Sequence, residues 1–200
     1  MATAYFSNFP VAPSSIVDDP LVLSDLRQCK IKEGAEFLEW VSQYVFTHKH
    51  KHLALKYPPG AILKIAGLED TIYRAKQEEV NGWGKFYLPD IVNMQVLGVV
   101  EGTSCLCDQL VLMTCEDKKL YAYDGDELHE VASSLEQLCN KKITYPADKS
   151  YYNGEAFQDM DEGDWAEVKK GEVGESLEQE HRKLTEEHKS TFLQNLKSQK

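Results

Sequence analysis

The chain has 200 residues, of which 42% are hydrophobic and 28% are charged, and its formal net charge is -11. This composition is typical of a globular protein with one core. The acidity excludes a broad surface for nucleic acid or for an anionic membrane, because both need a basic field. No apolar run approaches the roughly 20 residues that span a bilayer.

The N-terminus and the cysteines indicate a compartment. Residues 1–10 have neither the basic start nor the apolar stretch of a secretory signal. Five cysteines, an odd number, fit reduced thiols. We therefore expect a protein of the cytoplasm or nucleus that is not secreted and has no membrane partner.

Two helices are predicted in the N-terminal part. Asp18 and Asp19 precede Pro20, which is an acidic N-cap candidate before a proline at the first helical position. This pattern predicts a helix over residues 20–29. A second helix is predicted over residues 32–47, because apolar residues recur there with the period of one wide helix face. They are Phe37, Leu38, Val41, Tyr44 and Val45.

After residue 60 the pattern changes to strands. We predict a turn at residues 81–84 and antiparallel neighbours on either side of the short turns 116–118 and 124–126. Ser133 and Ser134 predict the cap of a further helix. Helices, then a β-meander, then a helix make an α+β fold. The candidate strands cover residues 61–67, 71–74, 85–88, 94–100, 109–115 and 119–123.

The charge is unevenly distributed. Residues 1–145 carry a net -6, residues 146–180 carry -8 and residues 181–200 carry +3. We predict a single α+β domain over 1–145 and an acidic loop or tail over 146–174. We predict a helix over residues 175–200. Its apolar face is narrow, so the helix alone would be only marginally stable. A short coiled coil or a helix docked on a partner are the alternatives. The residues of that face are Leu177, Leu184, Phe192 and Leu196.

One cysteine group is a candidate metal site. Cys105, Cys107 and Cys115 offer three thiolates, and His129 offers an imidazole. Paired zinc-binding cysteines usually have two to four residues between them, so a spacer of one residue is a poor match. We favour core thiols.

Two other groups have simpler explanations. His48, His50 and His52 alternate with lysines that repel a cation, so we predict a solvated helix end. Asp124 and Asp126 flank a glycine and are explained by a hairpin turn. We predict no metal and no cofactor.

Catalytic motifs are missing from the sequence. It has no nucleophile elbow, no zinc-protease helix and no phosphate-binding glycine loop. We therefore predict that the protein is not an enzyme. The alternative is a cysteine-dependent enzyme with a scattered site, using Cys107, Asp108 and His129.

Residues 97–138 carry a recognisable pattern of strands. Leu97-Gly98-Val99-Val100 is followed by strands at 107–113 and 120–124, and residues 127–138 then enter a helix. This pattern, over about a quarter of the chain, resembles the cytomegalovirus "unique-short twenty-two" family of large DNA viruses, within the SUKH superfamily. Asn81-Gly82-Trp83-Gly84 is similar to the Asn-Gly loop of SUKH proteins. The structural motif residues are Gly98, Leu112, Tyr121, Ala132 and Ser134.

The resemblance implies a fold and a role. It implies N-terminal helices packed on a mainly antiparallel twisted sheet, and non-enzymatic protein binding. We expect a viral protein that binds and antagonises a host defence protein; a cellular or toxin-neutralising immunity-type binder is the alternative. Double-stranded RNA, bound by some viral relatives, is disfavoured because Lys49, Lys51 and Lys56 are few.

The acidic charge predicts a basic protein partner, because complementary charge speeds encounter. The candidate partner-binding residues lie on the meander and in the acidic tract. They are Trp83, Tyr121, Tyr123, Asp124, Asp126, Asp161, Glu162, Asp164 and Trp165.

Overall fold

The computed structural model describes residues 20–105, 107 and 109–198, and the chain divides into two compact units, Met1–Ala156 and Phe157–Lys200. The predicted acidic N-cap, Asp18 and Asp19, lies outside the described residues.

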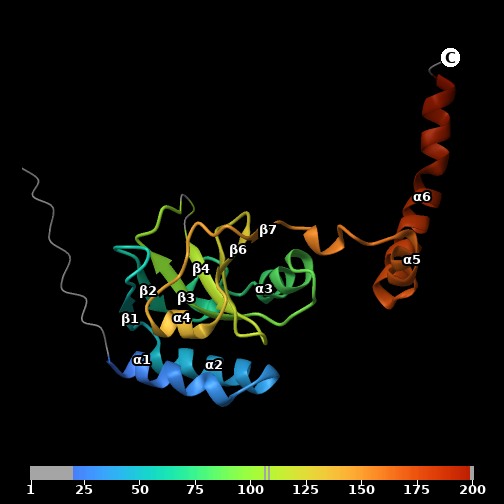
Figure 1. The fold of residues 1–200 in the computed structure, drawn as a ribbon. Helices are drawn as coiled ribbons and strands as arrows, with labels where there is room; N and C mark the ends of the chain where they lie inside the picture. The colour runs from blue at the N-terminus through green and yellow to red at the C-terminus, as the bar shows by residue number, and fades with distance from the viewer. Residues whose placement is uncertain (1–19, 106, 108, 199–200) are drawn as a thin grey trace, which may run out of the picture. The chain divides into compact units, whose positions relative to one another are not determined.

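The first unit combines helices with seven strands (Figure 1). Its helical segments are α1 (Pro20–Leu26), η1 (Arg27–Ile31), α2 (Gly34–His48), η2 (Leu68–Asp70), α3 (Gln77–Gly82), η3 (Trp83–Tyr87) and α4 (Leu135–Cys139). Its strands are β1 (His52–Ala54), β2 (Ile62–Ile65), β3 (Gln95–Glu101), β4 (Leu110–Thr114), β5 (Leu120–Tyr123), β6 (Leu128–Ala132) and β7 (Ser150–Tyr151).

The strands form one sheet in chain order, from β1 to β7, and every neighbouring pair is antiparallel. Short connections account for the pairs β4–β5 and β5–β6, since two strands joined by a tight turn must be antiparallel. The connections β2–β3 and β6–β7 are longer and contain helices. The predicted α+β fold, with N-terminal helices and a mainly antiparallel sheet, is confirmed.

Both faces of the sheet are buried, and each belongs to a different cluster. On β4, Leu110 and Leu112 face the first cluster, together with Phe37 and Val41 of α2. The alternate residues, Val111 and Met113, face the second cluster with α3 and η3. In Figure 1, α1 and α2 run along one side of the sheet, and α3 lies away from them. Burial on both faces explains why these strands read as continuous apolar runs.

The motif residues have structural roles in the sheet. Gly98 pairs with Leu112, and a Cβ on Gly98 would lie 2.2 Å from the backbone oxygen of Lys64. Leu112, Tyr121 and Ala132 are buried. The glycine is therefore needed because the neighbouring strand approaches too closely for any side chain.

The helix cap at residues 133–134 differs in detail from the prediction. Ser134 occupies the N-cap position of α4 with extended backbone, but its side chain makes no capping hydrogen bond. The hydroxyl of Ser133 instead accepts a hydrogen bond from Nε2 of Gln137 at 2.9 Å. The predicted position of the helix N-terminus is confirmed, whereas the predicted capping hydrogen bond is wrong.

The segment from residue 71 to 88 was predicted incorrectly. Residues 71–74 form bends and turns, and residues 81–88 run through the end of α3 and through η3 instead of a turn and a strand. Val80, Trp83 and Tyr87 recur at three and four residues and are buried against the sheet. This helical spacing, rather than the two glycines, determines the local structure.

The folded unit extends beyond the predicted boundary at residue 145. Tyr151 of β7 pairs with Leu128 of β6 and is buried, so the acidic stretch begins inside the sheet domain. The second unit holds the end of a short 3-10 turn at Glu155–Phe157, then α5 (Glu162–Lys170) and α6 (Glu172–Ser198). Part of the predicted loop or tail is therefore strand or helix.

The expectation that all cysteines are reduced thiols is wrong for two of them. Cys105 and Cys107 form a disulfide with their Cα atoms 5.5 Å apart, within the range that the bond requires. They lie on the connection between β3 and β4 rather than in a strand. Cys29, Cys115 and Cys139 are buried and are not part of this disulfide.

Within the described part of the chain, we find no helix with the length and apolar character needed to cross a membrane.

Candidate functional site

A cavity beside Trp83 is the candidate site. Its volume is about 220 Å³, less than the roughly 300–1,000 Å³ of pockets for drug-sized ligands. It suits one long side chain better than a cofactor. The lining residues come from α3, η3 and the turn after β7, and they are Glu78, Glu79, Gly82, Trp83, Phe86, Tyr87 and Asn153.

Helical spacing places the cavity walls. Glu79 and Trp83 are one turn apart, and Phe86 and Tyr87 follow on the next turn. The turn after β7 closes the cavity, because the backbone N–H of Gly154 donates to the carbonyl oxygen of Phe86 at 2.9 Å. The site therefore unites two segments that are distant in sequence.

An aromatic cluster lies behind the cavity. The ring of Trp83 is 4.7 Å from that of Tyr123 and meets Tyr73 edge-on at 5.1 Å. The hydroxyls of Tyr87 and Tyr123 are 3.3 Å apart, and that of Tyr123 donates to the carbonyl oxygen of Gly125 at 3.0 Å. Such packed rings give the cavity a rigid floor.

The rim of the cavity is both apolar and acidic. Phe86 is 42% exposed, whereas Trp83 is 1% exposed, so Phe86 offers most of the accessible aromatic surface. Glu78 and Glu79 are exposed beside it. An aromatic face next to carboxylates is an arrangement that attracts a guanidinium or an ammonium group.

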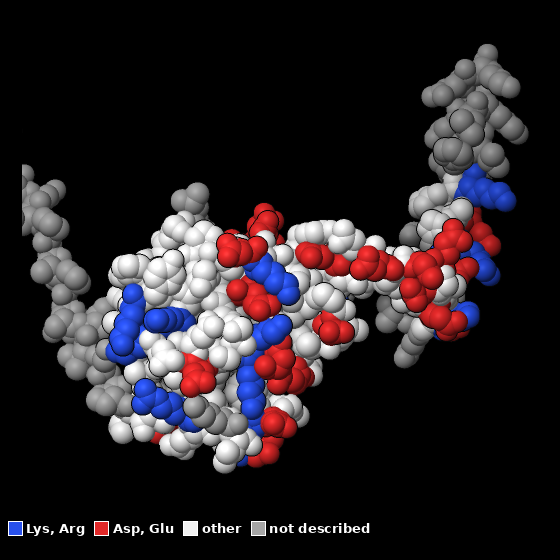
Figure 2. Space-filling view, in the orientation of Figure 1, with Lys and Arg blue, Asp and Glu red and all other residues white. Residues whose placement is uncertain are grey.

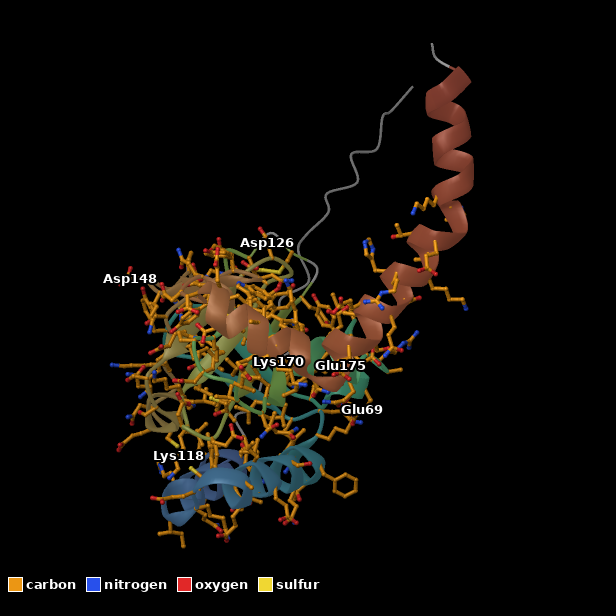
Figure 3. The ribbon with its side chains drawn as sticks, turned by 90° about the vertical axis from the view of Figure 1, so that its right-hand side faces the viewer. Glu69, Lys118, Asp126, Asp148, Lys170 and Glu175 are labelled. Carbon is orange, nitrogen blue, oxygen red and sulfur yellow. A yellow bond between two sulfur atoms is a disulfide. The ribbon has the colours of Figure 1, made fainter. Side chains whose placement is uncertain are left out.

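The pKa of Tyr87 reflects the same electrostatics. It is raised above its ordinary value, first by burial, then by the hydrogen bond with Tyr123, and further by the charges of Asp126 and Glu79. Two separate elements therefore contribute negative potential at this tyrosine. Figure 3 labels Asp126 on the β5–β6 turn, at the end of the sheet domain away from α1 and α2.

The β5–β6 turn is organised by Asp124. Its Oδ1 accepts the backbone N–H groups of Asp126 and Glu127, and its Oδ2 lies 2.9 Å from Nε2 of His129. Tyr145 donates its hydroxyl to the same Oδ2 at 3.2 Å. Burial raises the pKa of Asp124, but the hydrogen bonds from Glu127 and His129 outweigh it and leave the pKa below its ordinary value. Asp124 is thus a structural anchor of the turn.

The other predicted partner-binding residues of the sheet domain differ in accessibility. Tyr121 and Tyr123 are buried in the second cluster, and the hydroxyl of Tyr121 donates to Oδ2 of Asp117 at 3.4 Å. These two side chains are therefore too buried to contact a partner directly. Asp126 is exposed, and Trp83 contributes to the cavity wall.

The predicted residues of the acidic tract form the start of α5. Asp161 is the N-cap, and its carboxylate accepts the N–H groups of Gly163 and Asp164. Asp164 accepts the N–H of Asp161 in return, and Glu162 is exposed in the first turn. Trp165 is 43% exposed and lies 5.9 Å from the ring of Phe157. Helix capping accounts for two of these three carboxylates.

The candidate metal ligands do not converge. Within residues 20–105, 107 and 109–198, no three side chains of His, Cys, Asp or Glu lie close enough to hold a metal ion. His48 is buried rather than solvated, with Nε2 at 3.0 Å from Oδ2 of Asp25, because α2 continues through it. His52 is in β1, on another element.

The scattered cysteine site is also not assembled as proposed. Cys107 is in the disulfide, and Asp108 lies outside the described residues. The free thiol of Cys115 is buried, and burial together with the hydrogen bond to Asp117 raises its pKa to about 12. A thiol with so high a pKa is a poor nucleophile at neutral pH.

The basic residues considered for RNA binding are partly neutralised. Nζ of Lys49 lies 2.9 Å from Glu69 and 3.0 Å from Asp70. Glu69 is labelled in Figure 3.

The sequence reasoning missed Glu78, Glu79, Phe86, Tyr87 and Asn153. The signal for the first four was the helical period from residue 79 to 87, which the glycines at 82 and 84 concealed. Asn153 gave no local signal, because its place depends on the pairing of β7 with β6.

The antiparallel sheet with helices on both faces defines an α+β protein. The sequence profile of the US22-like family matches residues 35–145, which include every strand except β7. The chain therefore belongs to the US22-like family. No solved structure matches it.

Similar proteins come from several viruses. The chain is 27% identical over 125 residues to the uncharacterized gene 87 protein of Gallid herpesvirus 2, covering 62% of this chain and 70% of that protein. It is 29% identical over 131 residues to the uncharacterized protein 005R of Frog virus 3, covering 61% and 64%. It is also 27% identical over 79 residues to the uncharacterized protein FPV250 of Fowlpox virus, covering 39% and 56%.

Proposed function

We propose that this chain is a non-enzymatic, intracellular protein-binding module of viral origin, and that it binds and antagonises a host defence protein. The viral relatives support the origin. We also propose that the family lies within the SUKH superfamily, whose members include protein-binding immunity proteins.

The observation that carries the proposal is the cavity beside Trp83. It combines a rigid aromatic floor, the exposed ring of Phe86 and the carboxylates of Glu78 and Glu79. Aromatic residues packed around a pocket are typical centres of protein interfaces. The adjacent carboxylates select a basic side chain of the partner.

The wider charge distribution supports a basic partner. Residues 146–180 carry a net charge of -8. In Figure 2, acidic side chains are prominent on α5 and on the start of α6. Such a field accelerates encounter with a basic protein and matters most at low ionic strength.

The two histidine–carboxylate pairs of the sheet domain lie outside the cavity beside Trp83. Nε2 of His48 and Nε2 of His129 each face a carboxylate, of Asp25 and Asp124. Neither residue lines the cavity beside Trp83. A binding role uses that cavity without needing a nucleophile there.

The test is affinity capture from host cells with Glu79→Lys, at the rim of the cavity. Glu39→Lys is the matched control, because Glu39 is also an exposed glutamate on a helix, α2. We expect Glu79→Lys to lower recovery of the partner at least about tenfold, which corresponds to about 1.4 kcal/mol, and Glu39→Lys to leave it unchanged.

Equal recovery with both variants would refute the cavity as the binding site. Recovery of the wild-type chain without any stoichiometric protein would refute the binding function itself. Turnover of a small substrate by that chain would refute the non-enzymatic assignment.

A further inference from the structure

The disulfide between Cys105 and Cys107 closes a very short loop. The two cysteines are two positions apart in sequence, and their Cα atoms are 5.5 Å apart. A disulfide stabilises a fold mainly by restricting the unfolded chain, and this effect decreases as the closed loop becomes shorter. The Cys105–Cys107 disulfide therefore contributes little to folding stability, and stability alone does not explain it.

Other contacts hold the connection between β3 and β4 at both ends. At its start, Gly102 has a positive φ of 73°, and an added Cβ would lie 2.5 Å from the carbonyl oxygen of Gly60. At its end, Oε1 of Gln109 accepts the backbone N–H of Ile72 at 2.8 Å. The connection is therefore anchored without the disulfide, and the disulfide can open while the sheet domain stays folded.

Both cysteines of this disulfide line a cavity. They are half-buried, and the volume of the cavity is about 290 Å³. Cys29, Cys115 and Cys139, in contrast, are buried. Thiol–disulfide exchange requires an incoming thiolate to reach a sulfur, so accessible disulfides are the labile ones. The position of this disulfide therefore suits a reaction with another thiol.

The cavity presents polar groups beside the disulfide. Thr103 and Gln109 line it and carry a hydroxyl and an amide, which are hydrogen-bond donors. Glu101 also lines it and is exposed, so it offers a carboxylate. Donors suit the carbonyl and carboxylate groups of a peptide, and a carboxylate suits its ammonium group. Because its volume is near the lower limit for small-molecule pockets, the cavity fits a small zwitterionic peptide thiol.

The two sulfurs have different surroundings. Cys105 packs against the first cluster, and its backbone N–H donates to Oγ1 of Thr103 at 3.3 Å. Cys107 lies beside the β5–β6 turn, where a Cβ on Gly125 would be 4.0 Å from the Cβ of Cys107. Cys105 is therefore covered on the core side, which leaves Sγ of Cys107 as the better site of attack.

We propose that this disulfide exchanges reversibly with a small peptide thiol bound in the cavity. The thiolate of the peptide attacks Sγ of Cys107, the bond between the two cysteines breaks, and the electron pair leaves on Sγ of Cys105, which takes up a proton. A second peptide thiol then attacks the mixed disulfide, so that two thiols are oxidised to one peptide disulfide and the two cysteines are reduced. The reverse reaction, with the peptide disulfide as the oxidant, closes the bond again.

The test uses the full chain, with reduced and oxidised glutathione as the probes. Alkylation with N-ethylmaleimide, followed by intact-mass and peptide analysis, counts and locates the thiols. We expect reduced glutathione at millimolar concentration to expose thiols at Cys105 and Cys107 only, while the three buried cysteines stay unlabelled and the circular dichroism spectrum is unchanged. Oxidised glutathione should remove both thiols again. The proposal fails if the disulfide opens only when the chain unfolds, or if oxidised glutathione does not form it again.

Two variants test the assigned roles. Cys105→Ser lacks the leaving thiol, so Cys107 should retain one glutathione per chain after treatment with oxidised glutathione, whereas the wild-type chain should retain at least about tenfold less. Glu101→Gln should slow reduction by glutathione about threefold, the effect of losing one exposed ion pair, and should leave reduction by the uncharged 2-mercaptoethanol unchanged.

Two results with these variants would overturn the proposal. One is a Cys105→Ser chain that retains no glutathione. The other is a Glu101→Gln chain that reacts with the two thiols in the same ratio of rates as the wild-type chain. Neither residue lines the cavity beside Trp83, so failure of this proposal would leave the proposed binding function standing.

Discussion

The two units differ in where their apolar side chains lie. In the sheet domain, strands β4 and β5 are buried on both faces and the largest side chains, including Trp83 and Phe37, are nearly inaccessible. In the second unit, Trp165, Leu177 and Leu184 are about half exposed, at 43%, 60% and 50%. The same residue types are therefore buried in the core of one unit and exposed on the surface of the other.

Two of the three tryptophans, Trp83 and Trp165, test this contrast with the largest expected effect. Trp83→Ala should destabilise the sheet domain by about 3–5 kcal/mol, because it empties a fully buried site. Trp165→Ala, at a half-exposed position of α5, should change the free energy of unfolding by less than about 1 kcal/mol. Urea titrations followed by circular dichroism measure both, and equal effects would contradict the contrast.

Substitutions at two glycines near the cavity should have smaller effects on stability, and the two effects should have opposite signs. A Cβ on Gly84 would lie 2.2 Å from the carbonyl oxygen of Val92, so Gly84→Ala should cost about 1–3 kcal/mol. Gly82 ends α3, and its Cβ would meet only Phe86 at 3.5 Å. Gly82→Ala should therefore stabilise by up to about 1 kcal/mol. Thermal unfolding that ranks the two variants the other way would disprove the described packing of η3.

The β5–β6 turn gives the smallest effect, and it depends on pH. The folded-state pKa of Asp124 is lowered, so its contribution is present above the ordinary pKa of about 3.9 and is lost as pH falls below that value. Asp124→Asn should cost about 1 kcal/mol at pH 7 and should flatten the decline of stability between pH 4 and pH 2.

Asp126→Asn is the matched control for this change. Asp126 lies on the same turn and is exposed, whereas the carboxylate of Asp124 is bonded to His129 and Tyr145. The control should keep the wild-type acid slope. Identical slopes for all three proteins would show that Asp124 does not anchor the turn.

The predictable part of the fold is the part with local signals. The meander from β3 to β6 follows from apolar runs joined by short turns such as Glu116-Asp117-Lys118, because such turns permit one pairing only. Of the two N-terminal helices, α1 follows from Pro20 at its first position and α2 follows from the period of Phe37, Val41 and Tyr44. These signals are complete within a few residues of sequence.

The remainder depends on tertiary contacts. Glycines 82 and 84 suggested a turn, but burial of Trp83 and Tyr87 against the sheet fixes a helical backbone there. Strand β7 is two residues long and exists through its pairing with β6. The cavity needs both features, which is why Trp83 was predicted as a contact residue without the pocket around it.

The most direct test of the central claim is a site-specific photocrosslink in host cells. A photoreactive amino acid is placed at Phe86, on the rim of the cavity, and separately at Phe46, which is 84% exposed on α2 away from it. The cavity account predicts that position 86 is crosslinked to a basic segment of one protein and that position 46 is not. Equal labelling from both positions, or crosslinks from 86 to acidic segments, would contradict it.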